Sequence, residues 1–221
     1  MPVELLEQYE LQESVMPEWL EDLPTEHAQA IVQAAQSLAI VKVLDMPRER
    51  KLCNVHAILM LLSRAARFGF DVVSRLQDFG LDSVLCDRLN TMLATLTAFS
   101  DSIWAEAAAL AFKSTLTFDE LFRLRRVICT AVHETQTGFD LPATDAWRMQ
   151  AEDIQMGMTE GAPMPLGVIA AFLKMLHVRV AVVTECCGHV GRRDAGDATA
   201  PLLGGLLALE GHLHYLQATE F

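Results

Sequence analysis

The sequence places one cysteine where a thiol nucleophile would gain support from its surroundings. Cys53 begins an uninterrupted helical pattern that extends to about Arg67, and three basic residues come shortly before it, Arg48, Arg50 and Lys51. The start of a helix and nearby cations both stabilise a thiolate, which is the nucleophilic form of cysteine. Cys53 is therefore the first candidate for nucleophilic chemistry, although a small buried hydrophobic cysteine fits the same pattern.

A thiol nucleophile needs a group that takes its proton and later protonates the leaving amine, and histidine is the usual residue for both steps. His212 and His214 are two positions apart in a segment that predicts a strand, so we expect both side chains on one side of it. Four other histidines lie in apolar helical or strand patterns that are more typical of structural or surface residues: His27, His56, His133 and His177. The candidates for the base are therefore His212 and His214.

A zinc site is the second kind of chemistry that the residue types permit. Cys186, Cys187 and His189 cluster in one segment, and His212 and His214 follow near the end of the chain. Adjacent cysteines rarely bind one ion, however, and the usual Cys-x2-Cys spacing is missing. We therefore expect neither a metal nor another cofactor.

Composition and charge limit the class of protein. With 221 residues, of which 52% are hydrophobic and 21% charged, the chain is long enough for one globular domain and unlike a disordered, collagen-like or coiled-coil sequence. The formal net charge of −12 argues against binding to nucleic acid. A secretory signal pattern is missing and no apolar run approaches about 18 residues, so we expect no membrane insertion. Five cysteines without a paired spacing favour free thiols in a reducing compartment, either the cytoplasm or a host cytosol into which the protein is delivered.

The charge is distributed unevenly along the chain. Residues 1–45 contain nine acids and one base, a net charge of −8, which leaves −4 for the remainder. Residues 46–75 contain six bases and two acids. We interpret residues 1–44 as an acidic helical N-terminal extension of a domain that covers residues 45–221, and we expect a positive local field at Cys53.

Helical spacing dominates the first two thirds of the chain. An apolar stripe begins after Thr25 and reaches Ala39, and a polar stretch with a proline predicts a loop over residues 44–51 before the helix of Cys53. The further predicted helices are 82–98, 100–113, 117–134, 145–158 and 166–176. The predicted strands are 177–184, 201–209 and 212–219, with a long loop over residues 186–200. Helices first and a small sheet last indicate an α+β fold.

Several of these segments together resemble one protein family. The string Cys53-Asn54-Val55-His56-Ala57-Ile58 resembles the ovarian-tumour (OTU) cysteine proteases, whose nucleophile begins a helix in a similar pattern. Residues 124–128 are similar to the Leu-Arg helix of that family, and residues 164–170 and 177–184 are similar to its turn, short helix and hydrophobic strand. Gly211-His212-Leu213-His214-Tyr215 resembles its terminal Gly-x-His-Tyr segment. The resemblance covers about residues 45–219.

The resemblance implies a papain-like, OTU-like α+β fold, mostly helical at first and ending in a small antiparallel or mixed sheet, with a helical insertion at about residues 82–113. It implies a thiol protease that removes ubiquitin or a ubiquitin-like modifier, a deubiquitinase with Cys53 as nucleophile and His214 as general base. The third member of the site stays open among Gln217, Asp45 and Glu220.

Two alternatives follow from differences between this chain and the family pattern. Arg50-Lys51-Leu52 stands where the family commonly has Asp-Gly-Asn, which favours a weak or inactive OTU-like module that only binds ubiquitin or another partner. Cys86 is a rival nucleophile with an aspartate four positions before it. Cys53 is preferred because Ala57 and Ile58 match the family, and because Asp87 would oppose a thiolate at Cys86.

Overall fold

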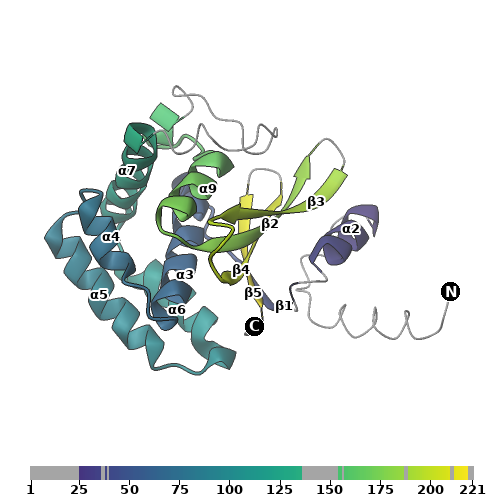
Figure 1. The fold of residues 1–221 in the computed structure, drawn as a ribbon, viewed down its shortest axis with the longest axis horizontal. Coiled ribbons are helices and arrows are strands. Elements are labelled where there is room, and N and C mark those ends of the chain that lie inside the picture. Colours follow the sequence, from purple (N-terminus) through teal and green to yellow (C-terminus); the bar gives the residue numbers. More distant parts are fainter. Residues whose placement is uncertain are drawn as a thin grey trace.

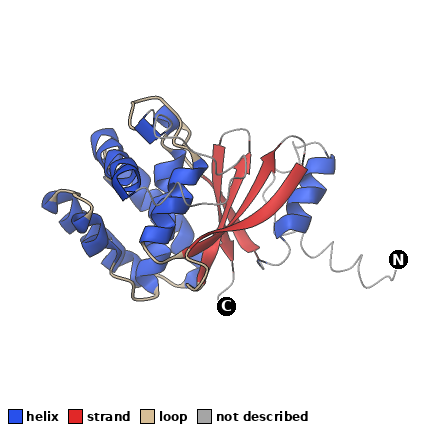
Figure 2. Cartoon of the chain, turned by 45° about the horizontal axis from the view of Figure 1, so that its top comes forward, coloured by secondary structure: helices blue, strands red, loops and turns tan. Residues whose placement is uncertain are grey.

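The structure is a computed structural model that describes residues 25–35, 38, 40–135, 154, 155, 157–186, 189–209 and 212–218. Most of the described helices gather on one side of a twisted sheet, whereas helix α2 lies on the other side (Figure 1 and Figure 2). The predicted α+β fold is therefore confirmed. None of the described helices has the length and apolar character that crossing a membrane requires.

Helix α3 forms the centre of the helical layer. Its first thirteen residues are buried, and it contacts the neighbouring helices as well as two strands. The helices are α2 (Thr25–Ala35), α3 (Cys53–Arg67), α4 (Val72–Asp78), α5 (Ser83–Thr97), α6 (Asp101–Thr115), α7 (Phe118–Thr135) and α9 (Leu166–Met175), and a short 3-10 helix, η3 (Glu49–Lys51), comes just before α3.

Local sequence signals explain where two of these helices begin. The side chain of Asp82 accepts a hydrogen bond from the backbone N–H of Leu85 at 3.0 Å, which caps α5. At α7 the backbone N–H of Thr117 donates to Glu120 at 2.8 Å, and the N–H of Glu120 donates to the Thr117 hydroxyl at 3.4 Å. This reciprocal pair is the predicted capping box.

Within the described residues, the sheet has five strands in the order β1-β5-β4-β2-β3. Only the β2 and β4 pair is parallel, and the other three pairs are antiparallel. The strands are β1 (Ile40–Asp45), β2 (Arg179–Cys186), β3 (His189–Gly196), β4 (Leu202–Leu209) and β5 (His212–Ala218). Successive side chains of a strand point to opposite faces, so β5 directs Leu213 and Tyr215 to the main core and Leu216 to a second cluster that includes Ile31 of α2.

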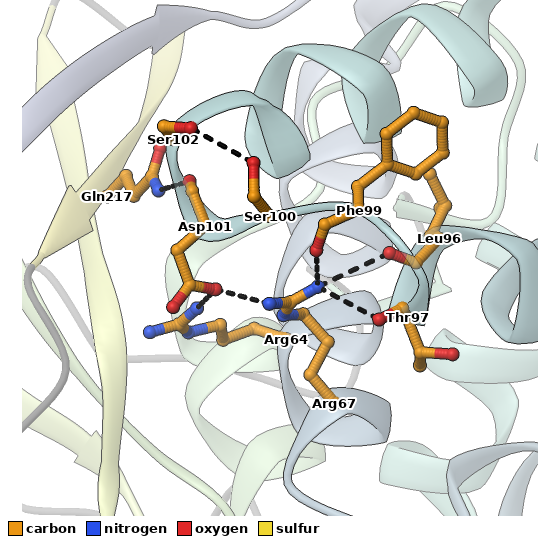
Figure 3. Close-up of polar contacts among 9 residues, drawn as sticks. All are labelled: Arg64, Arg67, Leu96, Thr97, Phe99, Ser100, Asp101, Ser102 and Gln217. Atoms are coloured by element: carbon orange, nitrogen blue, oxygen red, sulfur yellow. Dashed lines mark hydrogen bonds and ion pairs between the residues drawn. The ribbon is translucent and has the colours of Figure 1, made fainter.

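The helical pair within the predicted insertion is tied to both α3 and β5. Asp101, the first residue of α6, pairs with Arg67 and lies 3.4 Å from the guanidinium of Arg64, and its carbonyl accepts a 2.8 Å hydrogen bond from Gln217 (Figure 3). Nearby, the ring of Trp104 packs edge-on against Tyr215 with centroids 6.2 Å apart. These contacts fix α6 against the strand that carries the two candidate histidines.

The structure corrects the element prediction at three places. Residues 40–45 form β1, so the loop expected from residue 44 was wrong at residues 44 and 45. The β-branched residues Ile40, Val41 and Val43 favour a strand, and the segment pairs with β5. Residues 36, 37 and 39 of the helix expected to reach Ala39 lie outside the described residues. Strand β3 lies inside the expected loop over 186–200. It is an edge strand with charged residues, so its sequence lacks the apolar signal of a buried strand.

Helix α4 was the third difference, because no helix was predicted between α3 and α5. Its start follows from Asp71, whose side chain accepts a hydrogen bond from the N–H of Ser74 at 3.2 Å. Some predictions lie outside the described residues: residues 1–24 of the acidic extension, most of the helix over 145–158, and Cys187, Gly211 and Glu220.

Candidate active site

Cys53 is the first residue of α3 and its side chain is buried, with 4% of the residue exposed. The thiol donates a hydrogen bond to Oδ1 of Asn54 at 3.1 Å. The amide nitrogen of Asn54 in turn donates to the carbonyl of Met164, just before α9. The resting thiol is therefore held by an amide that the segment before α9 orients.

The end of strand β1 explains how Cys53 comes close to β5. The register of β1 against β5 ends at the pair Asp45 and His214, so β1 does not continue alongside Leu213. Helix α3 packs against β5 there, and the backbone N–H of Leu213 lowers the pKa of the Cys53 thiol. The thiol thus lies at the edge of β5, beside the residue that separates the two candidate histidines.

Burial raises the pKa of the Cys53 thiol above its usual value. The backbone N–H groups of Leu213, Asn54 and Cys53 and the charge of Lys51 act in the opposite direction, but burial is the largest effect. The expected stabilised thiolate was therefore wrong for this structure, because removing the sulfur from water outweighs the helix start and the basic loop.

The loop before Cys53 adopts an unusual backbone. Arg50 and Lys51 have φ angles of 49° and 58°, in the left-handed region that favours glycine. Contacts of the Arg50 side chain hold the loop: its guanidinium lies 3.0 Å from Glu160 and 4.4 Å from the ring centre of Phe118. The segment that replaces Asp-Gly-Asn therefore forms a strained turn without a glycine.

Asp45, His212 and His214 form a compact cluster at the end of β1. Oδ1 of Asp45 is 3.0 Å from Nδ1 of His214 and 2.6 Å from Nε2 of His212. The two imidazole rings are almost perpendicular, with centroids 4.7 Å apart. One carboxylate oxygen therefore contacts both histidines. The side chain of Asp45 is 53% exposed, whereas that of His214 is 4% exposed.

Burial lowers the pKa of His214 to about 4, and the charges of His212 and Arg48 act in the same direction. Asp45 opposes these effects without reversing them. At neutral pH the ring of His214 is therefore uncharged and can accept a proton. The resting site consists of a neutral thiol and a neutral imidazole.

The structure separates the other sequence candidates from this cluster. Gln217 points to the face of β5 opposite His214 and hydrogen-bonds to Asp101. Cys86 lies on α5, where its thiol donates to the carbonyl of Leu81 at 3.6 Å, and its pKa is raised by burial and by two nearby aspartates, Asp82 and Asp87. Of the candidates for a third member, the structure brings Asp45 to the histidines and holds Gln217 elsewhere.

The structure separates His189 from His212 and His214, the other histidines considered for a zinc site. His189 lies on β3, and strands β2 and β4 separate β3 from β5, which carries His212 and His214. Three strand spacings of about 4.8 Å make a separation of roughly 14 Å. Instead, Asp45 completes a group with His212 and His214 whose ligand atoms all lie within 4.8 Å of one another.

Two further residues, Arg125 and Asn54, shape the site, and neither of them was assigned a role from the sequence. The fully buried side chain of Arg125 donates to the carbonyls of Gly157, at 2.5 Å, and Ala162. It thereby holds the turn that leads to Met164, the partner of Asn54. The signals available were an arginine in the apolar stripe of α7 and an asparagine directly after the nucleophile.

Several solved structures are similar to this chain, among them three complexes of OTUB1. A chain of the h/ceOTUB1–ubiquitin aldehyde–UBC13~Ub complex matches with a TM-score of 0.54 and 18% identity, over 98% of this chain and 97% of that chain. The h/ceOTUB1–ubiquitin aldehyde–UBCH5B~Ub complex gives a TM-score of 0.53 and 19% identity over the same shares. A ceOTUB1–ubiquitin aldehyde–UBC13~Ub complex gives 0.51 and 18%, over 91% and 90%.

No protein-family model and no curated protein sequence matches the chain. The likeness therefore lies in three-dimensional structure and is weak in sequence. It extends over almost the full length of both chains in the first two comparisons. The chain has an OTU-like fold.

Proposed function

We propose that this protein is a thiol-dependent isopeptidase or peptidase, a deubiquitinase that removes ubiquitin or a ubiquitin-like modifier. The observation that carries the proposal is that the Cys53 thiol is near enough to Leu213 of β5 for its backbone N–H to lower the thiol pKa, while the adjacent His214 contacts Asp45 of β1. The OTU-like fold supports the modifier as substrate class, because the similar structures are complexes of OTUB1 with ubiquitin aldehyde.

The proposed reaction is acyl transfer. The sulfur of Cys53 attacks the carbonyl at the C-terminus of the modifier while neutral His214 accepts the thiol proton. His214 then gives this proton to the leaving amine as the C–N bond breaks, and water hydrolyses the thioester, which restores the thiol. Backbone N–H groups at the start of α3 and in the turn before it stabilise the oxyanion.

Asp45 serves as the orienting member of the site. A carboxylate beside the imidazole stabilises the imidazolium that forms when His214 takes the proton. The side chain of Asn54 opposes the first step, because its Oδ1 holds the thiol hydrogen in the resting state. Substrate binding must therefore turn the thiol from the amide towards the imidazole.

A second candidate function is an OTU-like module that binds ubiquitin or another partner without turnover. The raised pKa of Cys53 and the glycine-free turn before it favour this alternative. The raised pKa reduces thiolate formation, and the turn strains the backbone that would hold the oxyanion. Neither feature affects a binding surface elsewhere.

Ubiquitin with a thiol-reactive group at its C-terminus distinguishes the two functions. We expect the wild-type chain to be labelled, Cys53→Ala to remain unlabelled, and Cys86→Ala to be labelled like wild type. Labelling that survives Cys53→Ala and disappears with Cys86→Ala would transfer the nucleophile to α5. Absence of labelling with retained ubiquitin binding would favour the module, and a panel of ubiquitin-like modifiers tests the substrate choice in the same assay.

A further inference from the structure

We propose that Asp45, His212 and His214 form a zinc-binding site, and that bound Zn²⁺ reversibly inhibits the proposed thiol chemistry. The inhibition rests on the proposed function, whereas binding of the ion does not. Two histidines and one carboxylate are a ligand set that Zn²⁺ accepts, with a water in the fourth position.

The distances within the cluster suit a small tetrahedral ion. Zinc binds nitrogen and oxygen at about 2.0–2.2 Å, which places neighbouring ligand atoms roughly 3.4 Å apart. Here Oδ1 of Asp45 is 2.6 Å from Nε2 of His212 and 3.0 Å from Nδ1 of His214, and all three atoms lie within 4.8 Å. Side-chain shifts of about 1 Å would therefore complete the coordination.

The cluster is buried on the side of the two histidines and open to solvent on the side of Asp45. The side chains of His212 and His214 are 11% and 4% exposed, whereas that of Asp45 is 53% exposed. The ion and its water ligand can therefore enter past the carboxylate. The two imidazoles lie two residues apart on β5 and therefore on the same face, so the backbone already fixes the spacing of two ligands.

Zinc at this site would remove the base from the reaction. A neutral imidazole has one lone pair and one N–H, so a ring that binds the ion through Nδ1 carries its proton on Nε2. His214 could then accept no proton from Cys53. Removal of the ion by a chelator restores the lone pair, which makes the inhibition reversible.

The charge near the cluster sets the expected strength of binding. Arg48 acts electrostatically on His214, and its positive charge opposes a cation at the same place. Asp45 supplies the only carboxylate of the ligand group. We therefore expect binding weaker than at a structural zinc site, and tighter binding when the charge of Arg48 is removed.

The test is calorimetric titration of the full chain with Zn²⁺, in a Cys53→Ala background that removes the nearby thiol. We expect one site that His212→Asn or Asp45→Asn weakens at least roughly tenfold, and that Arg48→Gln strengthens. His177→Asn is the matched control, because His177 also pairs with an aspartate, Asp197, at 3.0 Å but lies outside the cluster. Circular dichroism confirms that each variant is folded.

Substitution with Co²⁺ provides a second measurement, because visible absorption reports tetrahedral nitrogen and oxygen ligation. Loss of this absorption in Asp45→Asn, whose altered side chain is half exposed, would support the assignment even if His212→Asn failed to fold. Equal Zn²⁺ affinity in the Cys53→Ala parent and the Asp45→Asn variant would overturn it. Zinc binding with these properties in a chain that ubiquitin probes never label would uphold the site and reject the proposed function.

Discussion

Asp45 and His214 face each other as the last residue pair of β1 and β5, and Oδ1 of one lies 3.0 Å from Nδ1 of the other. The pairing depends on a strand that lies far from β5 in sequence. Because β1 ends at this pair, its terminal carboxylate meets the imidazole, while the backbone N–H of Leu213, the residue before His214, lowers the pKa of Cys53.

Asp45→Asn tests this relationship in catalysis. The amide keeps the shape of the side chain but cannot stabilise the imidazolium that forms on His214, so we expect the rate of ubiquitin-probe labelling to fall roughly 100-fold. Gln217→Leu is the control, because Gln217 lies on the other face of β5 and bonds to Asp101. It should lower the free energy of unfolding by about 1 kcal/mol and leave labelling nearly unchanged. Equal effects of the two substitutions on labelling would refute the role of Asp45.

The raised pKa of Cys53 predicts how its reactivity depends on pH. Burial keeps the thiol protonated at neutral pH in the chain without substrate, so alkylation by iodoacetamide should continue to accelerate above about pH 8.5, the usual value for cysteine. Mass spectrometry of the peptide that contains Cys53 measures this rate separately from the other thiols. A rate that is already maximal at pH 7 would show a resting thiolate and contradict the neutral pair.

Lys51→Gly should increase stability, because Lys51 has a φ of 58° and glycine adopts this conformation without strain. We expect the free energy of unfolding in urea to rise by about 0.5–1 kcal/mol. Lys113→Gly makes the same chemical change inside α6 and should lower it by about 1 kcal/mol. If both substitutions destabilise the chain equally, the left-handed turn carries no strain.

Arg125→Met should destabilise the chain and disturb the site together. The substitution leaves the carbonyls of Gly157 and Ala162 without their buried donor, which we expect to cost about 2–4 kcal/mol and to slow probe labelling. Arg123→Met, two residues earlier on α7, loses only an exposed ion pair with Asp82 and should cost less than about 1 kcal/mol. Stability that is unchanged by Arg125→Met would contradict the role of the guanidinium.

The sequence predicted much of the fold because its strongest signals are local. The apolar stripe after Cys53 and the capping box at Thr117 mark helices through contacts between near neighbours. Strand β3 escaped prediction because an exposed edge strand carries charged residues and has little apolar patterning. Strand β1 escaped prediction because it forms by pairing with β5, a contact distant in sequence.

The candidate site was likewise predictable only where its residues are close in sequence. His212 and His214 were found because a strand places residues two apart on one face. Asp45 stood among three candidates for the third member, since only strand pairing brings it opposite His214. The pKa of Cys53 could not be predicted from the basic residues before it, because burial depends on the packing of α3 against the sheet.

The central claim is that Cys53 and His214 act together on the C-terminus of a ubiquitin-type modifier. Its most direct test is release of a fluorescent amine from the C-terminus of ubiquitin by the full chain. We predict turnover by wild type and by Cys86→Ala, and none by Cys53→Ala or His214→Ala when both variants are folded. Turnover that persists in folded Cys53→Ala, or that is lost only with Cys86→Ala, would contradict the assignment.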